Sequence, residues 1–162
     1  MGKKIRGRVN KTLGDNTLRN RWETYIVKRV YVDVVADLFH VGHINLFKRA
    51  REFGDHLIVG VHSDKEVEKY KRRPTIPEQQ RYAMIKYCRL VDELIEDAPL
   101  TITEEFICEN DIHMIVHGDD FKEGNKQHEV PNNMGIMRYV PYTSGVSTTE
   151  IIRKILQSGR TE

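Results

Sequence analysis

The sequence predicts a single doubly wound α/β domain, in which five parallel strands form a sheet with helices on both faces. Short runs rich in Val and Ile alternate with longer amphipathic or polar runs between residues 30 and 157. This alternation is typical of parallel sheets, because each strand needs a crossover segment that returns the chain to the same edge. The length of 162 residues suits one hydrophobic core.

The strands are expected where the apolar runs are short and rich in β-branched residues. The first, VYVDVV, covers residues 30–35 and is interpreted as a buried strand. Four further strands are expected at residues 56–61, 91–96, 112–118 and 136–141.

The helices are expected between these strands. Ile44, Phe47 and Ala50 recur near helical spacing, and Gly54 is the stop signal. Asp64 is expected to cap a short helix. The other helices are expected at residues 77–89, 101–110 and 147–157, residues 71–77 form a loop with two prolines, and residues 119–135 form a long loop or a short helix.

Polar residues directly follow several of the predicted strands. In a Rossmann-like sheet, ligands bind at the carboxyl ends of the strands, where the helices begin. The residues at these positions are His40 and His43, Ser63 and Asp64, Asp119 and Asp120, and Ser147, Thr148 and Thr149. Their convergence predicts a ligand site at this edge.

The segment DLFHVGH, residues 37–43, has the strongest chemical signal. A packed core does not explain two histidines at this spacing, because imidazole is costly to bury without a partner. Gly42 lets the backbone approach a ligand closely, and His43 stands at the start of a helix, which attracts anions. We interpret His40 and His43 as two donors to one phosphate group. The alternative is a pair of surface histidines on a turn.

The segment TSGVSTTE, residues 143–150, is a second candidate phosphate site. Gly145 indicates an unusual turn, and Ser147 is a good N-cap with Glu150 three residues later, which fits a capping box. An ordinary helix start explains this pattern equally well. The functional interpretation adds hydroxyl groups and backbone amides that are directed at an anion.

Two charged segments have weaker signals. Lys71, Arg72 and Arg73 lie in a loop that suits a mobile clamp on polyphosphate, although a charge run is usually a solvated face. Asp119 and Asp120 could accept hydrogen bonds from a base or ribose, or approach Mg²⁺. A turn formed by aspartate side chains explains them at least as well.

The charge is unevenly distributed along the chain. Residues 1–29 hold nine basic and two acidic side chains, although the whole chain carries a net charge of only +2. Such a segment can bind nucleic acid or a membrane face, but a solvated extension or a vector-derived leader is favoured. We therefore expect an extension at 1–29, a domain at 30–157 and a tail at 158–162.

Several other classes of site have no support in the sequence. Cys88 and Cys108 lack ligand-like spacing and the histidines are scattered, so no metal site is assigned. Walker-type, GxGxxG and GxSxG motifs are absent. No apolar run approaches a membrane span and no signal peptide is recognised, which favours free thiols and a cytoplasmic protein.

Four segments together resemble the nucleotidyltransferase superfamily that carries an HxGH signature, and its cytidylyltransferase branch most closely. DLFHVGH matches the signature. GDHLIVGVHSDKEVEKYK, followed by EQQRY, is similar to the segment of ethanolamine-phosphate and choline-phosphate cytidylyltransferases that carries a phosphate-binding lysine. CRLVDELIEDAP and SGVSTTEII resemble two later segments of these enzymes. The likeness covers about residues 30–157.

The resemblance implies a role for each matched residue. His40 and His43 would contact the triphosphate, together with Lys71 from a flexible loop. Arg89, Asp92 and Leu100 would lie near the acceptor substrate or a dimer interface. The implied nucleotide-binding residues are Val35, Ala36, Asp37, Asp119, Asp120, Tyr142, Thr143, Gly145, Ser147, Thr148 and Thr149.

Three departures from the family pattern stand out, one of which is Val34 in place of a glycine and Ala36 in place of a bulky residue. Tyr142 stands where a phosphate-binding arginine is expected, so Arg138 or residues 71–73 would have to supply its charge. Leu100 stands where choline and glycerol enzymes have tryptophan and ethanolamine enzymes have tyrosine. A cation–π contact from that position is therefore lost.

The resemblance implies direct in-line transfer of a cytidylyl group from CTP, with Mg²⁺, to a phosphorylated alcohol of the phosphoethanolamine type. It also implies a homodimer, and no nucleic-acid partner is expected. One alternative is an enzyme that uses ATP and a sugar phosphate, because heptose-phosphate adenylyltransferases also lack the missing arginine. The other is a non-catalytic nucleotide- or nucleic-acid-binding module that uses the basic segment.

Overall fold

The computed structural model describes residues 27–119 and 126–159. The expected basic extension therefore lies almost wholly outside the described residues, and so does Asp120. Within the described ranges, no helix has the length and apolar character needed to cross a membrane.

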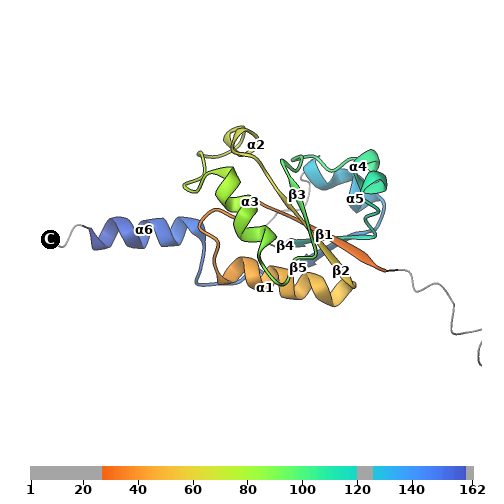
Figure 1. Ribbon diagram of the computed structural model, residues 1–162, viewed down its shortest axis with the longest axis horizontal. Helices are drawn as coiled ribbons and strands as arrows, with labels where there is room; N and C mark the ends of the chain where they lie inside the picture. The colour runs from red at the N-terminus through yellow and green to blue at the C-terminus, as the bar shows by residue number, and fades with distance from the viewer. Residues whose placement is uncertain (1–26, 120–125, 160–162) are drawn as a thin grey trace, which may run out of the picture.

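A five-stranded parallel sheet runs through the described part of the chain, in the order β3-β2-β1-β4-β5 (Figure 1). Its strands are β1 (Arg29–Val34), β2 (His56–Val61), β3 (Glu93–Glu96), β4 (Met114–Gly118) and β5 (Met137–Val140). Every pairing is parallel, which confirms the predicted fold class. The strand order reverses between β1 and β4, and ligands bind at such a reversal.

Helices cover both faces of the sheet. Phe47 and Ile85 pack on one face, whereas Ile107 packs on the other. The helices are α1 (Val41–Ala50), α2 (Asp64–Glu68), α3 (Glu78–Lys86), α4 (Glu104–Glu109), α5 (Glu129–Asn133) and α6 (Thr148–Ser158), with 3₁₀ turns at Arg51–Phe53 and Lys126–His128.

Several helix bounds differ from the prediction, including that of α4, which begins at Glu104 and not at residue 101. The first helix begins at Val41, two residues earlier than expected, because the side chain of His40 caps it. Ser63, and not Asp64, caps α2, since Ser63 Oγ accepts the N–H of Glu66 at 3.3 Å. In both cases a polar side chain before the helix satisfies an N–H group that has no partner within the helix.

The central strand β1 supplies both layers of the core. Val30, Val32 and Val34 belong to the cluster that α1 and α3 cover, while Tyr31 belongs to the cluster under α4 and α5. Successive side chains of a strand point to opposite faces, so Asp33 shares the Tyr31 face. The strand thus carries a 7% exposed carboxylate to the carboxyl edge of the sheet.

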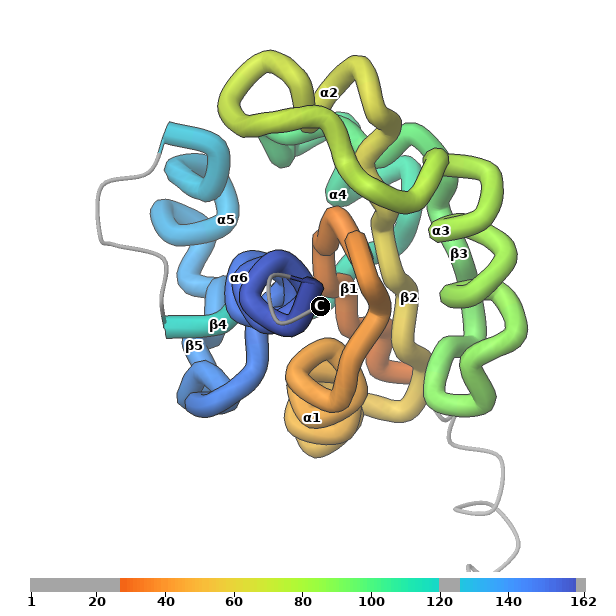
Figure 2. Tube along the Cα trace, turned by 90° about the vertical axis from the view of Figure 1, so that its left-hand side faces the viewer, coloured from red at the N-terminus to blue at the C-terminus, as the bar shows by residue number. Residues whose placement is uncertain are grey.

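The last helix, α6, projects from the body of the protein (Figure 1). None of its residues is buried, and Ile155 and Leu156 are 60% and 65% exposed. Figure 2 shows α6 end-on, in front of the sheet. The helix therefore touches the rest of the domain through its first turn and the loop before it.

Candidate active site

A cavity of about 690 Å³ lies at the carboxyl ends of the strands, around the reversal between β1 and β4. The structure brings most of the predicted site residues together on its wall. Those that line it are Val35, Ala36, Asp37, His40, His43, Lys71, Leu100, Tyr142, Thr143, Ser147, Thr148 and Thr149. Segments about 100 residues apart in the sequence therefore share one site.

His40 and His43 are tied to the backbone at the start of α1. His40 Nδ1 accepts the N–H of Gly42 at 3.1 Å, and His43 Nδ1 accepts the N–H of His40 at 3.2 Å. The two rings lie with their centroids 4.1 Å apart. A backbone N–H can only donate, so each Nδ1 carries a lone pair and each neutral ring carries its proton on Nε2. The pair thus offers two N–H donors on the cavity wall.

The surroundings of this pair favour the neutral rings. Burial, and then the neighbouring His40, lower the pKa of His43 to about 4. Burial also lowers the pKa of His40. At neutral pH the pair therefore acts through hydrogen-bond donors whose tautomer is fixed by the helix start, and a bound anion would strengthen its hold on protons.

Gly42 is required by the His40 ring itself. A Cβ atom at Gly42 would lie 2.8 Å from Cε1 and 2.9 Å from Nδ1 of His40. The absence of a side chain lets the ring fold back over the first turn of α1. Gly42 also lines the cavity, so close approach of its backbone to a ligand stays a prediction.

The two candidate phosphate segments are in direct contact. Thr148 Oγ1 donates a hydrogen bond to the carbonyl oxygen of Asp37 at 2.7 Å, and Asn45 Nδ2 donates to Thr143 Oγ1 at 3.3 Å. These bonds join the start of α6 to the DLFHVGH turn. The hydroxyl proton of Thr148 therefore bonds to the DLFHVGH turn and is not directed at an anion.

Ser147 and Gly145 shape the start of α6. Ser147 Oγ accepts the N–H of Glu150 at 3.1 Å, which is one half of the expected capping box and leaves the Ser147 proton for a ligand. Gly145 has φ of +80°, a conformation that favours glycine, although Gly145 itself does not line the cavity. The turn aims the N-terminus of an eleven-residue helix at the cavity.

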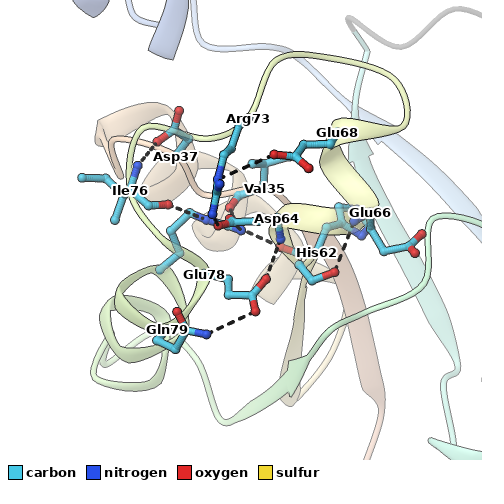
Figure 3. Close-up of polar contacts among 12 residues, drawn as sticks. Val35, Asp37, His62, Asp64, Glu66, Glu68, Arg73, Ile76, Glu78 and Gln79 are labelled. Atoms are coloured by element: carbon cyan, nitrogen blue, oxygen red, sulfur yellow. Dashed lines mark hydrogen bonds and ion pairs between the residues drawn. The ribbon is translucent and has the colours of Figure 1, made fainter.

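Asp37 anchors the loop of residues 71–77. Its Oδ1 accepts the N–H of Ile76 at 3.0 Å (Figure 3). Its Oδ2 accepts the N–H of Thr75 at 3.0 Å and a guanidinium N–H of Arg72 at 3.1 Å. Burial alone would raise the pKa of Asp37, but these donors outweigh it and hold the pKa below its usual value. The carboxylate is thus occupied by the protein.

The three basic residues of this loop do not act together. Lys71 lines the cavity, with its Nζ 5.0 Å from the centroid of the Tyr70 ring. Arg73 is turned away and pairs with Asp64 at 3.5 Å and Glu68 at 3.6 Å (Figure 3). The expected clamp of three cations is therefore wrong for Arg73.

Nothing in the sequence pattern singles out Arg81, because an arginine in a helix usually faces solvent. It is fully buried. Its guanidinium donates to Asp64 Oδ1 at 2.8 Å and to the carbonyl oxygens of His62 at 2.9 Å, Ile76 at 3.0 Å and Val35. Figure 3 shows these partners, which come from the ends of two strands, α2 and the 71–77 loop. Arg81 thus positions the cavity wall without lining it.

A second polar group, formed by Asp33, His62, His117 and His128, was also not predicted. Asp33 Oδ2 lies 3.4 Å from His62 Nε2 and 3.5 Å from His128 Nε2, and the rings of His117 and His128 lie 5.1 Å apart. Burial opposes ionisation of Asp33, but hydrogen bonds from His128 and His62 hold its pKa well below the usual range. Burial would lower the pKa of His62, but Asp33 raises it. No short spacing in the sequence signals this group.

Asp119 and Arg138 do not line the cavity. Asp119 Oδ1 accepts the N–H of Tyr142 at 2.7 Å, so it holds the loop after β5. Arg138 donates to the carbonyl oxygens of Gly135 and Met137 at 3.0 and 2.7 Å. It therefore does not replace the phosphate-binding arginine that the family pattern has at position 142. The prediction for Asp120 lies outside the described residues.

Asp92 and Arg89 also lie away from the cavity. Asp92 Oδ2 accepts the N–H of Leu57 at 2.7 Å and pairs with Arg51 at 2.5 Å, at the amino end of β2. Arg89 is exposed in the turn before β3. A direct contact with substrate is not supported for either residue, and a place at a subunit interface stays a prediction.

A parallel sheet with this strand order, with an HxGH turn against a hydroxyl-rich helix start, is the architecture of a nucleotidyltransferase domain. A family model described as cytidylyltransferase-like matches residues 32–154. The chain belongs to this family.

Individual relatives agree with this assignment. The ethanolamine-phosphate cytidylyltransferase of Dictyostelium discoideum is 43% identical over 131 residues, which cover 79% of this chain and 36% of that protein. The choline-phosphate cytidylyltransferase A of Homo sapiens is 34% identical over 134 residues, covering 80% and 36%. The chain thus matches little more than a third of the length of either relative.

The fold is also similar to a solved structure. The crystal structure of the lipopolysaccharide core biosynthesis protein from Thermoplasma volcanium has a TM-score of 0.59 and 28% identity, covering 72% of this chain and 97% of that chain.

Proposed function

We propose that this domain transfers a cytidylyl group from CTP to a phosphorylated alcohol of the phosphoethanolamine type and releases pyrophosphate. The observation that carries the proposal is the meeting of the His40–His43 pair with the start of α6 on one cavity wall. Two neutral N–H donors and a helix N-terminus together suit a polyphosphate. The names of the curated relatives support cytidylyl transfer and an ethanolamine phosphate acceptor.

The reaction needs no nucleophilic side chain. A phosphate oxygen of the acceptor attacks the α-phosphorus of CTP, a new P–O bond forms, and the bond from the α-phosphorus to the bridging oxygen breaks. Negative charge then grows on the departing pyrophosphate. His40 Nε2–H, His43 Nε2–H and Lys71 are the groups of this chain that stabilise that charge, with the N–H groups at the start of α6.

Mg²⁺ is proposed to enter as part of the substrate, the Mg²⁺ complex of CTP. Both carboxylate oxygens of Asp37 already accept hydrogen bonds from the protein, so Asp37 offers no ready ligand. Mg²⁺ commonly keeps several waters and binds the phosphate oxygens of a substrate. The contribution of the chain is to hold the triphosphate.

The acceptor pocket has no aromatic side chain at position 100, since Leu100 lines the cavity there. A quaternary ammonium group gains about 0.5–2 kcal/mol from an aromatic face. We therefore expect an ammonium head group to bind roughly 2- to 30-fold more weakly here than beside an aromatic side chain.

The test is a pyrophosphate-release assay that pairs CTP or ATP with phosphoethanolamine, phosphocholine, glycerol 3-phosphate or a sugar phosphate. We expect turnover with CTP and phosphoethanolamine. Turnover confined to ATP and a sugar phosphate would assign the domain to the adenylyl-transferring alternative. Nucleotide binding with no turnover on any acceptor would contradict the enzymatic proposal.

A homodimer is proposed on family resemblance and on the exposed apolar face of α6, where Ile155 and Leu156 face solvent. Sedimentation equilibrium measures the oligomeric state directly, and a monomer at micromolar concentration would contradict this proposal. A cytoplasmic location stays a prediction.

A further inference from the structure

Histidines that are scattered in the sequence gather around one buried carboxylate. Asp33, His117 and His128 each offer a ligand atom, and these atoms all lie within 4.8 Å of one another. Asp33 is 7% exposed and His128 is 1% exposed. Among the described residues, the ion pairs of Asp33 are with His62 and His128. No lysine or arginine pairs with this carboxylate in the described part of the chain.

Backbone carbonyl groups fix where two histidines of this group carry a proton. His62 Nδ1 lies 2.9 Å from the carbonyl oxygen of Ala98, and His117 Nδ1 lies 3.0 Å from that of Gly118. A carbonyl oxygen can only accept, so each Nδ1 carries a proton. His62 also donates from Nε2 to Asp33, whereas the neutral ring of His117 has its lone pair on Nε2. A backbone carbonyl on one nitrogen is also the usual second partner of a histidine that binds a metal through the other nitrogen.

The spacing around Asp33 suits a small cation. His128 Nε2 lies 3.5 Å from Asp33 Oδ2, and the three ligand atoms all lie within 4.8 Å of one another. Two ligand atoms on a tetrahedral metal at bond lengths of about 2.0–2.1 Å lie roughly 3.3 Å apart. The other carboxylate oxygen, Asp33 Oδ1, is buried and accepts no hydrogen bond from the residues that the structure describes.

We propose that Asp33, His117 and His128 bind a divalent transition-metal ion of the Zn²⁺ type. One carboxylate and two imidazoles form a set of three protein ligands that leaves a further position open. Asp33 and His117 also line the cavity, so the open position faces bound substrate. His62 is a positioning residue, since its Nε2 contacts Asp33 Oδ2 at 3.4 Å. This site is distinct from the phosphate-binding wall, and metal binding by it does not depend on the proposed reaction, although its role toward the acceptor rests on that proposal.

A metal here would act on the acceptor in a particular way. Its open position takes a neutral amine or a hydroxyl group, whose lone pair it coordinates. A quaternary ammonium group has no lone pair and cannot bind in this way. The site therefore suits an acceptor with a primary amine or hydroxyl.

The experiment measures metal binding by the full chain, purified without a histidine tag and treated with chelator. Zn²⁺ is titrated by calorimetry, and Co²⁺ is added separately to record its visible absorption. We expect about one ion per chain, and a Co²⁺ spectrum with the intensity of a four- or five-coordinate site. No CTP or acceptor is present, so the result reports metal binding alone and not the proposed cytidylyl transfer.

Two variants and one control locate the site. His117→Gln and His128→Gln should each weaken Zn²⁺ binding by at least about 100-fold. His113→Gln is the matched control, because His113 lies at the amino end of β4, and it should bind Zn²⁺ as the unchanged chain does. His117 is only half-buried, so His117→Gln keeps the test decisive if His128→Gln does not fold.

If the unchanged chain binds no stoichiometric Zn²⁺, the proposal is overturned. Equal loss of binding in His113→Gln and His128→Gln would also overturn it, because the ion would then be held elsewhere.

Discussion

Two groups of histidines share one cavity, and their backbone partners give them opposite chemistry. In the phosphate-facing pair, His40 and His43, each Nδ1 accepts a backbone N–H. In the group around Asp33, Nδ1 of His62 and Nδ1 of His117 each face a backbone carbonyl. The first arrangement puts a proton on Nε2 and suits an anion. The second puts a proton on Nδ1, and in the neutral ring of His117 it leaves on Nε2 a lone pair that suits a cation.

The difference shows that the secondary structure around a histidine decides what the ring can bind. His40 and His43 stand at a helix start, where backbone N–H groups lack partners. His62 and His117 lie at the ends of β2 and β4, beside the carbonyl oxygens of Ala98 and Gly118. The same side chain is therefore a donor in one place and, in our proposal, a metal ligand in the other.

The largest expected effect comes from removing a donor of the phosphate-facing pair. His43→Ala should lower kcat/KM for CTP by about 10²–10³, or about 3–4 kcal/mol, because a preorganised donor to the developing charge is lost. Pyrophosphate release measures this. His113→Ala, at the opposite end of the sheet, is the control and should keep the rate. Near wild-type turnover in His43→Ala would show that the pair does not contact the triphosphate.

The pH dependence of stability tests whether the first group is neutral. The pKa of His43 is about 4 in the folded chain and near 6.5 when unfolded. Between these values the unfolded chain binds more protons, so stability is intact above pH 6.5 and falls as the pH drops toward 4, by up to about 1.4 kcal/mol per pH unit. Urea denaturation of the unchanged chain and of His43→Asn measures the difference. Identical slopes in the two would contradict a neutral His43.

A pair of variants at His40 separates helix capping from phosphate binding. His40→Ala should lose about 1 kcal/mol of stability, because the cap of α1 is removed, whereas His40→Asn should keep most of it. Both should lose turnover, since neither supplies the Nε2–H donor. Thermal unfolding and the pyrophosphate assay together read the two effects. Retained activity in His40→Asn would mean that the cap alone matters.

The smallest effect is expected at the outer edge of the phosphate-facing wall. Asp119→Ala removes the acceptor of the Tyr142 N–H and should raise the KM for CTP roughly 5-fold, the equivalent of about 1 kcal/mol for one hydrogen bond. Asp119→Asn, which keeps an acceptor oxygen, should lie closer to the unchanged chain. Equal losses in both would show that the charge of Asp119, and not its hydrogen bond, matters.

The sequence predicts the fold and the meeting of the phosphate segments for a clear physical reason. Alternating strands and helices place all strand ends on one edge, so residues that follow β1 and precede α6 must approach each other. The capping role of His40 was missed because histidine is not a preferred N-cap residue.

The sequence does not predict the polar groups whose members are far apart along the chain. Arg81 lies in a helix with other charged residues, and its burial depends on four partners from separate segments. Asp33, His62 and His128 stand on different elements, so no short spacing links them. Only the packing of α5 and its preceding turn against the sheet reveals that they share one group.

The bond between Thr148 and Asp37 spans 111 residues, and it has a consequence for synthesis of the chain. Because the amino-terminal part emerges first, the turn with His40 leaves the ribosome long before the helix that completes the opposite wall. A nascent chain that ends before residue 148 lacks the start of α6, which is one of the two segments proposed to bind the triphosphate. Any stabilisation by nucleotide therefore arrives late, after the sheet has been made.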